Sequence, residues 1–434
     1  MTDLDRREAG ALLLGAPFAG AAGALPASGR TLVSWARQAS IYEVNLRQFT
    51  PEGTLRAFEA HLPRLAKMGV GILWLMPLQP IGTKNRKGTL GSYYSIRDYT
   101  AVNPEFGTLA DLRRVVHRAH ALGMKVLLDW VANHTAWDHP WTTQHPDWFQ
   151  RNAQGELVGF TFQPEGGKVE VWDDVVGLDY GQRPLWEAMA DAMLFWLREA
   201  GFDGFRCDVA SLVPLPFWEY VRPKLEAVKP VFMLAEADKP ELHARAFDMG
   251  YDWKLFDTLK QLSRGNAGPA ALAAWWEHRR ARYPADAIGM NFTGNHDSNS
   301  WEGSDAELYG SLPAFQALAA VAALLPGMPL IYGGQEAFFE KRLQFFEKDA
   351  IAWGPRRLER FYARLLALKR THAALMTTEI GDDTLRFDDT GHERVLRFTR
   401  RHAGRQLTLT ANLSGTPARA GDTTLAPWAW SVRA

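Results

Sequence analysis

From about residue 30 onward, short apolar runs alternate with longer segments whose apolar residues recur at helical spacing. The short runs are apolar nearly throughout, which is typical of parallel strands that are buried on both faces. We predict strands at residues 41–46, 71–77, 125–131, 204–209, 231–237, 251–255, 287–293 and 329–333. Amphipathic helices are predicted between them, among others at residues 54–68, 108–122, 184–200 and 217–228. Eight alternations of strand and helix predict a closed (β/α)₈ barrel over residues 30–375.

One connection in this pattern is far longer than the others. Residues 134–183 separate the third predicted strand from the next helix, and they are rich in Trp, His, Pro and Gly. A loop of this length in a compact domain is usually functional. In a barrel it follows the carboxyl end of a strand, which is the end where active sites lie. We therefore predict an inserted region beside the active site.

The helical pattern stops near residue 376. Residues 384–387, 395–400 and 406–411 alternate between apolar and polar positions, and turn residues separate them. This alternation predicts a small antiparallel β domain over residues 376–434.

The first 29 residues differ in composition from the rest of the chain. Arg6 and Arg7 precede a stretch rich in Ala, Gly and Leu at 11–27, with small residues at 22–24 where a signal peptidase could cut. A signal peptide implies a periplasmic or secreted protein, whereas a disordered tail leaves the protein in the cytoplasm. Two prolines and three glycines interrupt the stretch, so no stable membrane span is expected.

The amino-acid composition argues against nucleic acid as a binding partner and is compatible with a sugar. The 49 Lys and Arg residues balance the 49 Asp and Glu residues, so the chain lacks the broad positive field that nucleic acid requires. Its 17 Trp residues suit the flat apolar faces of sugars, although they also suit a large core. The single cysteine, Cys207, cannot form a disulfide within the chain, and we interpret it as a packed side chain.

Four acidic residues lie at the carboxyl ends of predicted strands. They are Asp129, Asp208, Glu236 and Asp297. Such positions converge on one mouth of a barrel, where acids from several strands are typical of catalysis. Two carboxylates that flank a glycosidic bond can hydrolyse it, one as nucleophile and one as proton donor. Arg206 shares a strand face with Asp208, and its guanidinium would keep that carboxylate ionised.

Four segments with these acids carry a resemblance to a known family. They read DWVANH at 129–134, GFRCDVA at 204–210, LAEAD at 234–238 and FTGNHD at 292–297. In order and spacing the chain resembles the α-amylase superfamily, glycoside hydrolase family 13, over about residues 35–375. Further matching segments are GILWLMP at 71–77, NPEFGT at 103–108 and GMPLIYGGQE at 327–336.

The resemblance implies roles for the matched residues. Asp208 would be the nucleophile, Glu236 the general acid/base, and Asp297 a ligand of sugar hydroxyls that stabilises the transition state. Arg206 would orient Asp208, and Asp129 would support the site from behind.

The resemblance also implies how the sugar beside the cleaved bond is held. His134 and His296 would hydrogen-bond that sugar, and Tyr94 would stack beneath it. Asn133 matches the family's calcium-ligand asparagine, but calcium needs several oxygen ligands and the sequence identifies only this one. No organic cofactor is expected.

The chain also departs from the family pattern. Amylases often carry a Lys-His pair shortly after the nucleophile, and residues 209–212 read VASL instead. Val209 is similar to the residue found in α-1,6-acting members, while residues 175–180 match neither of the family's known specificity segments for that position. Linkage preference therefore stays open.

The leading hypothesis is a retaining hydrolase of α-glucans or malto-oligosaccharides. An α-glucosyltransferase or trehalose-forming isomerase on the same fold is the first alternative, because the catalytic acids serve both. A non-catalytic sugar-binding or accessory protein is a second alternative, but such proteins usually lose one of the acids that are present here.

Overall fold

The computed structural model describes residues 28, 32–163, 168–377 and 384–434. The candidate export segment at residues 1–29 lies outside the described residues, except for Ser28. Within the described ranges, no helix has the length and apolar character needed to cross a membrane.

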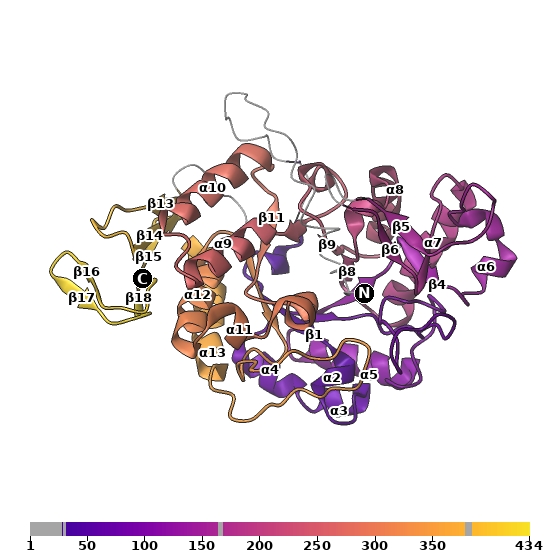
Figure 1. Ribbon diagram of the computed structural model, residues 1–434, viewed down its shortest axis with the longest axis horizontal. Coiled ribbons are helices and arrows are strands. Elements are labelled where there is room, and N and C mark those ends of the chain that lie inside the picture. The colour runs from indigo at the N-terminus through magenta and orange to yellow at the C-terminus, as the bar shows by residue number, and fades with distance from the viewer. Residues whose placement is uncertain (1–27, 29–31, 164–167, 378–383) are drawn as a thin grey trace.

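The centre of the molecule is a closed barrel of eight parallel strands, counted over the described residues (Figure 1). Around the barrel the order is β1, β12, β11, β10, β9, β8, β3, β2, so chain neighbours are mostly spatial neighbours. The strands are β1 (Ile41–Val44), β2 (Ile72–Leu75), β3 (Lys125–Trp130), β8 (Gly204–Cys207), β9 (Phe232–Ala235), β10 (Met249–Tyr251), β11 (Ile288–Asn291) and β12 (Met328–Tyr332). They are buried almost throughout, and the predicted barrel is confirmed.

Helices surround the barrel. They are α2 (Leu46–Phe49), α3 (Leu55–Glu59), α4 (Leu62–Met68), α5 (Leu109–Ala121), α7 (Arg183–Glu199), α8 (Leu215–Glu226), α9 (Trp253–Ser263), α10 (Ala270–Arg282), α11 (Asp305–Tyr309), α12 (Leu312–Leu324) and α13 (Glu359–Thr371). Short single turns are η1 (Ser34–Ala36), η3 (Ala210–Leu212), η4 (Pro240–His243), η5 (Ser298–Glu302) and η6 (Ala373–Leu375). Helix α5 begins as its sequence predicts, because Thr108 and Asp111 form a reciprocal capping box.

Two predicted elements differ from the structure. The helix predicted at 54–68 is two helices, α3 and α4, because Pro63 fits only the first turn of a helix and the chain restarts there. The strand predicted at 251–255 was wrong except for Tyr251. Asp252 caps α9 by accepting from the backbone N–H of Leu255 at 3.0 Å, so the chain is already helical from Trp253.

The inserted region holds several short elements. They are β4 (His134–Ala136), α6 (Trp141–Gln144), η2 (Pro146–Trp148), β5 (Phe160–Phe162), β6 (Glu170–Trp172) and β7 (Val175–Gly177). Strands β4 and β7 pair antiparallel, as do β5 and β6. Phe160 and Trp172 pack against Val209, directly after β8. The inserted region therefore packs against the carboxyl end of β8.

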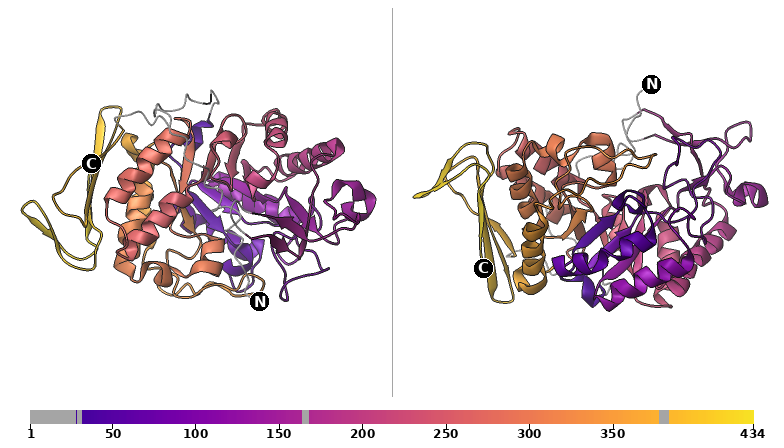
Figure 2. Two further views of the ribbon diagram at one scale, coloured as in Figure 1. Left: turned by 45° about the horizontal axis from the view of Figure 1, so that its top comes forward. Right: turned by 90° about the horizontal axis from the view of Figure 1, so that it is seen from below.

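A separate antiparallel sheet follows the barrel, as the alternation of its sequence predicted. Its strands are β13 (Leu385–Phe387), β14 (Val395–His402), β15 (Arg405–Asn412) and β18 (Trp430–Arg433), with a hairpin of β16 (Ala418–Ala420) and β17 (Thr423–Leu425). Figure 2 shows this yellow sheet standing against the orange helices at the end opposite the insertion.

A buried cation joins the sheet to the barrel. Arg400 of β14 donates to the carbonyl oxygens of Leu324, at the end of α12, and of Met376. Within the barrel domain, Lys369 of α13 donates to the carbonyl oxygens of Gly327 and Leu375. Helix α12 itself is apolar on all sides, and β15 lies against it.

Candidate active site

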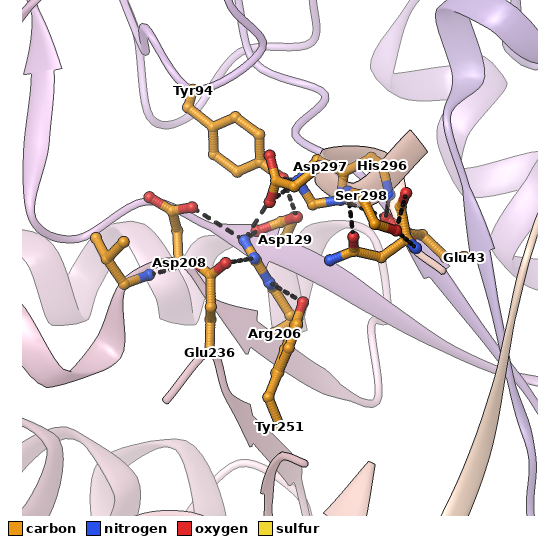
Figure 3. Close-up of polar contacts among 12 residues, drawn as sticks. Glu43, Tyr94, Asp129, Arg206, Asp208, Glu236, Tyr251, His296, Asp297 and Ser298 are labelled. Atoms are coloured by element: carbon orange, nitrogen blue, oxygen red, sulfur yellow. Dashed lines mark hydrogen bonds and ion pairs between the residues drawn. The ribbon is translucent and has the colours of Figure 1, made fainter. Parts of the chain in front are cut away.

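The predicted acids meet at the carboxyl ends of the barrel strands. Asp129 is near the end of β3, Asp208 follows β8, and Glu236 follows β9. Asp297 lies in the turn after β11. Figure 3 shows these side chains grouped around the guanidinium of Arg206. The sequence prediction that these residues converge is therefore met by the geometry.

Arg206 is the centre of the cluster, and its side chain is fully buried. Nη1 donates to Asp129 Oδ1 at 2.9 Å and to Asp208 Oδ1 at 3.0 Å. Nη2 lies 2.9 Å from Glu236 Oε1 as an ion pair, and Nε donates to the Tyr251 hydroxyl at 3.2 Å. Burial would lower the pKa of Arg206, but the carboxylates of Asp129 and Glu236 outweigh it and hold its pKa well above the ordinary value. One permanent cation thus ties three carboxylates together.

Asp129 is held from several sides and has no exposed surface. Its Oδ2 accepts from the indole N–H of Trp74 and from the hydroxyl of Tyr94, both at 3.0 Å. Burial raises the pKa of Asp129 even though Arg206 acts to lower it. Asp129 therefore fixes the position of the Arg206 guanidinium.

Val209 has an unusual backbone that affects Glu236. Its φ of 36° lies in the left-handed region, which a β-branched residue adopts only at a cost. In this conformation its N–H donates to Glu236 Oε2 at 2.8 Å. The apolar packing of Val209 against Phe160 and Trp172 holds the strained turn in place. The Glu236 carboxyl is thereby held by Arg206 at one oxygen and by a backbone amide at the other.

A close approach of two strands explains the glycine that begins β8. Gly204 has φ 151°, and a Cβ at this position would lie 1.9 Å from the carbonyl oxygen of Phe232 in β9. Only glycine allows β8 and β9 to lie this close. This backbone allows Gly204 to pair with Phe232 at the start of the β8–β9 ladder.

A second group of polar residues lies next to the acids. Tyr94 and the ring of His296 are stacked, with centroids 5.5 Å apart, and the Tyr94 hydroxyl is 2.7 Å from His296 Nε2. The same nitrogen lies 3.1 Å from Asp297 Oδ2. Because Tyr94 also bonds Asp129, this group is continuous with the cluster around Arg206.

His134 lies in the inserted region at the start of β4. Its Nδ1 is 3.1 Å from the Asn133 amide nitrogen, and its ring centroid is 5.6 Å from Trp172 and 6.1 Å from Phe160. Since both aromatic rings pack on Val209, His134 is on the Asp208 side of the site.

Calcium at Asn133 stays a prediction. Among the residues that the structure describes, no three His, Cys, Asp or Glu side chains gather where they could hold a metal ion. The Asn133 amide nitrogen is turned to His134. Calcium takes six to eight oxygen ligands, which include backbone and amide carbonyls as well as carboxylates.

Three residues of the site were not among the sequence candidates. Glu43 of β1 contacts His296, Trp74 of β2 contacts Asp129, and Tyr251 of β10 contacts Arg206. Glu43 could have been recognised as the one carboxylate within an otherwise apolar strand run, IYEV. Trp74 and Tyr251 give no such signal, because aromatic residues are ordinary in a barrel core.

Comparison with known proteins identifies the family. The model of the alpha-amylase catalytic domain matches residues 26–156. An alpha-amylase from Lactobacillus plantarum is 33% identical, with a TM-score of 0.78 over 88% of this chain and 90% of that one. The chain belongs to the α-amylase superfamily, glycoside hydrolase family 13. A noncanonic maltogenic alpha-amylase from Thermotoga neapolitana is 31% identical, with a TM-score of 0.76 over 87% of this chain and 86% of that one.

Curated members of the superfamily with related sequences differ in activity. Alpha-amylase MalA of Haloarcula japonica is 29% identical over 79% of this chain and 50% of its own length. An alpha-1,4-glucan:maltose-1-phosphate maltosyltransferase of Pseudomonas aeruginosa is 29% identical over 85% of this chain and 58% of its own length. The chain thus spans about half the length of these curated relatives. Membership of the α-amylase superfamily is consistent with both hydrolysis and transfer.

Proposed function

We propose that this chain is a retaining hydrolase of α-glucosidic bonds that acts on α-glucans or malto-oligosaccharides. The observation that carries the proposal is the guanidinium of Arg206, which contacts both Asp208 and Glu236. Two carboxyl groups that share one guanidinium favour the shorter separation known for glycosidases, about 5 Å, which goes with retention of configuration. A longer separation would leave room for a water molecule between the second carboxylate, acting as base, and the sugar.

In the first step, Asp208 attacks the anomeric carbon of the sugar. Figure 3 shows one Asp208 oxygen on Arg206 and the other directed away from the guanidinium. As the carbon–oxygen bond to the leaving sugar breaks, Glu236 transfers its proton to that oxygen. The products of this step are a glycosyl ester on Asp208 and a released sugar with a free hydroxyl group.

In the second step, water replaces the released sugar. Glu236, now a carboxylate, takes a proton from the water as its oxygen attacks the anomeric carbon. The bond to Asp208 breaks, and both carboxyl groups return to their starting states. Held at both oxygens by Val209 and Arg206, Glu236 keeps one position for the two opposite proton transfers.

Asp297, His296, His134 and Tyr94 complete the proposed site by binding the sugar next to the cleaved bond. Asp297 would accept hydrogen bonds from the hydroxyl groups of this sugar, and His296 would donate to one of them. Tyr94 would lie under the sugar ring. Buried groups of fixed geometry stabilise developing charge well because they need no reorganisation.

A transferase is the second candidate, and the maltosyltransferases among the relatives favour it. The two functions share the first step and differ in whether water or a sugar attacks the intermediate. The same arrangement of Asp208 and Glu236 serves both, so the acceptor side of the site decides between them.

The test is the product profile of the purified protein. Maltotriose, pullulan, isomaltose and soluble starch are supplied separately, and maltose 1-phosphate is supplied with an α-1,4-glucan acceptor. Shorter sugars released with the α configuration support the hydrolase, and the preferred substrate gives the linkage. Elongated or rearranged products support the transferase. An Asp208→Asn variant that folds and keeps its activity would contradict both.

A further inference from the structure

His296 lies between two buried carboxylates. Its Nδ1 is 2.5 Å from Glu43 Oε1, and its Nε2 is 3.1 Å from Asp297 Oδ2 and 2.7 Å from the Tyr94 hydroxyl. A neutral imidazole carries one N–H, so it can donate at only one of its two nitrogens. With an acceptor at each nitrogen, the geometry favours the doubly protonated imidazolium.

Tyr94 could reverse this argument if its hydroxyl donated to His296. That hydroxyl has one proton and also lies 3.0 Å from Asp129 Oδ2. A carboxylate is the stronger acceptor, so the Tyr94 hydroxyl donates its hydrogen bond to Asp129 and not to His296. The Tyr94 oxygen then accepts from His296 Nε2, which again requires a proton on that nitrogen.

The burial of Glu43 points in the same direction. Its side chain has no exposed surface, and within the described residues its Oε2 makes no hydrogen bond. A charge in such a place needs a partner of opposite sign. His296 is in direct contact with Glu43, and the positive charge of Arg206 acts on it from farther away.

The electrostatics of the surroundings agree with an ion pair. Burial alone would lower the pKa of His296, but Asp297 and Glu43 outweigh it and raise that pKa to about 10. Burial raises the pKa of Glu43, while His296 and Arg206 act to lower it and Asp297 acts to raise it. Burial raises the pKa of Asp129, and the charges of Arg206 and His296 both act to lower it.

We propose that Glu43 is a positioning residue that holds His296 as an imidazolium throughout the catalytic cycle. The proposal rests on the proposed function and deepens it. The charged ring keeps Asp297 ionised and fixed at its Oδ2, ready to accept from sugar hydroxyls. It also places a fixed positive charge beside Asp129 and Asp297, on the side of the site away from Arg206.

The first test measures the proton state directly. Protein with ¹⁵N-labelled histidine gives ring nitrogen signals for its 12 His residues, and the His296 signals are those lost in His296→Gln. We expect both His296 nitrogens to be protonated at about pH 8, where an ordinary histidine is neutral. In Glu43→Gln we expect a singly protonated ring that titrates near the ordinary value of about 6.5, and in Glu43→Asp we expect the imidazolium to persist.

The second test follows kcat/KM against pH with an aryl α-maltoside whose leaving group needs no proton. This substrate removes the dependence on Glu236 as an acid, so the alkaline side of the wild-type profile should be flat. In Glu43→Gln a pKa near 6.5 would leave only about a thirtieth of His296 charged at pH 8, so kcat/KM should fall about thirtyfold between pH 5.5 and 8.

Glu336→Gln is the matched control. Glu336 is also a buried carboxylate of the barrel, but it accepts from Tyr42 and Arg64, outside the site. It should lose stability as Glu43→Gln does and keep the wild-type pH profile. A singly protonated His296 in the wild type, or a Glu43→Gln profile that matches the wild type, overturns the proposal. Activity in Asp208→Asn would instead overturn the proposed function and leave the histidine result standing.

Discussion

Replacing Arg206 by lysine tests whether one guanidinium holds the catalytic carboxylates. The substitution keeps the charge but replaces a planar group with several donors by a single ammonium. Arg206 reaches Asp129, Asp208 and Glu236 through two nitrogens that lie 2.9 to 3.0 Å from their oxygens. The lysine side chain is shorter and ends in a single nitrogen, so it cannot occupy the positions of Nη1 and Nη2 at the same time.

The expected magnitudes follow from these contacts. Breaking a fully buried ion pair costs about 3–5 kcal/mol, because the remaining charge stays without a partner. A shift of about 1 Å in a catalytic group costs about 100-fold in rate. Arg206→Lys should therefore lose about 3–5 kcal/mol of unfolding free energy and at least about 100-fold in kcat/KM.

The assay combines urea unfolding with kcat/KM over a range of pH, and Arg222→Lys is the control. Arg222 is also buried and pairs with Asp248 through two hydrogen bonds of 3.0 and 3.1 Å, away from the site. The control should lose comparable stability and keep its turnover. An Arg206→Lys protein that stays within threefold of the wild type at every pH would refute the reasoning.

Three further predictions concern single groups. Glu236→Gln should keep far more activity on a substrate with an activated aryl leaving group than on maltotriose, and equal losses on both would contradict its role as acid. Burial raises the pKa of the Cys207 thiol well above its ordinary value, so the folded protein should not react with a thiol reagent, and Cys207→Ser should keep its turnover within a few-fold. Burial also raises the pKa of Asp305 to about 7, even though Gln335 and Phe339 donate to it. A raised folded-state pKa contributes stability below about pH 4 that is lost as the pH rises through about 7, so urea unfolding should show a weaker pH dependence over this window in Asp305→Asn.

The sequence predicted the barrel well because its strands are buried on both faces. Such strands are continuous apolar segments, which can be recognised without knowing the structure of the loops around them. Seven of the eight predicted strands overlap the observed strands for most of their length. The sixth failed because β10 has only three residues, and the capping carboxylate of Asp252 turns the chain into α9 at once. Because Asp252 lies within the predicted strand at 251–255, the sequence pattern did not reveal that this residue begins a helix.

The candidate site was predicted from strand ends, and that signal has a clear limit. It finds acids that follow a strand, such as Asp208 and Glu236, because their place in the chain is distinctive. It does not find Glu43, whose importance comes from a contact with His296, 253 residues away. Nor does it show that Arg206 reaches Glu236, since this depends on the pairing of β8 with β9.

The way the C-terminal sheet meets α12 has a consequence for how the chain can be divided. Helix α12 is apolar around its whole circumference, so one of its faces must be covered by something other than the barrel. Strand β15 provides that cover, and Arg400 closes the carbonyl end of the helix. A protein shortened after residue 376 would expose this face to water and present it to other molecules. We therefore expect the barrel to self-associate when it is separated from the sheet.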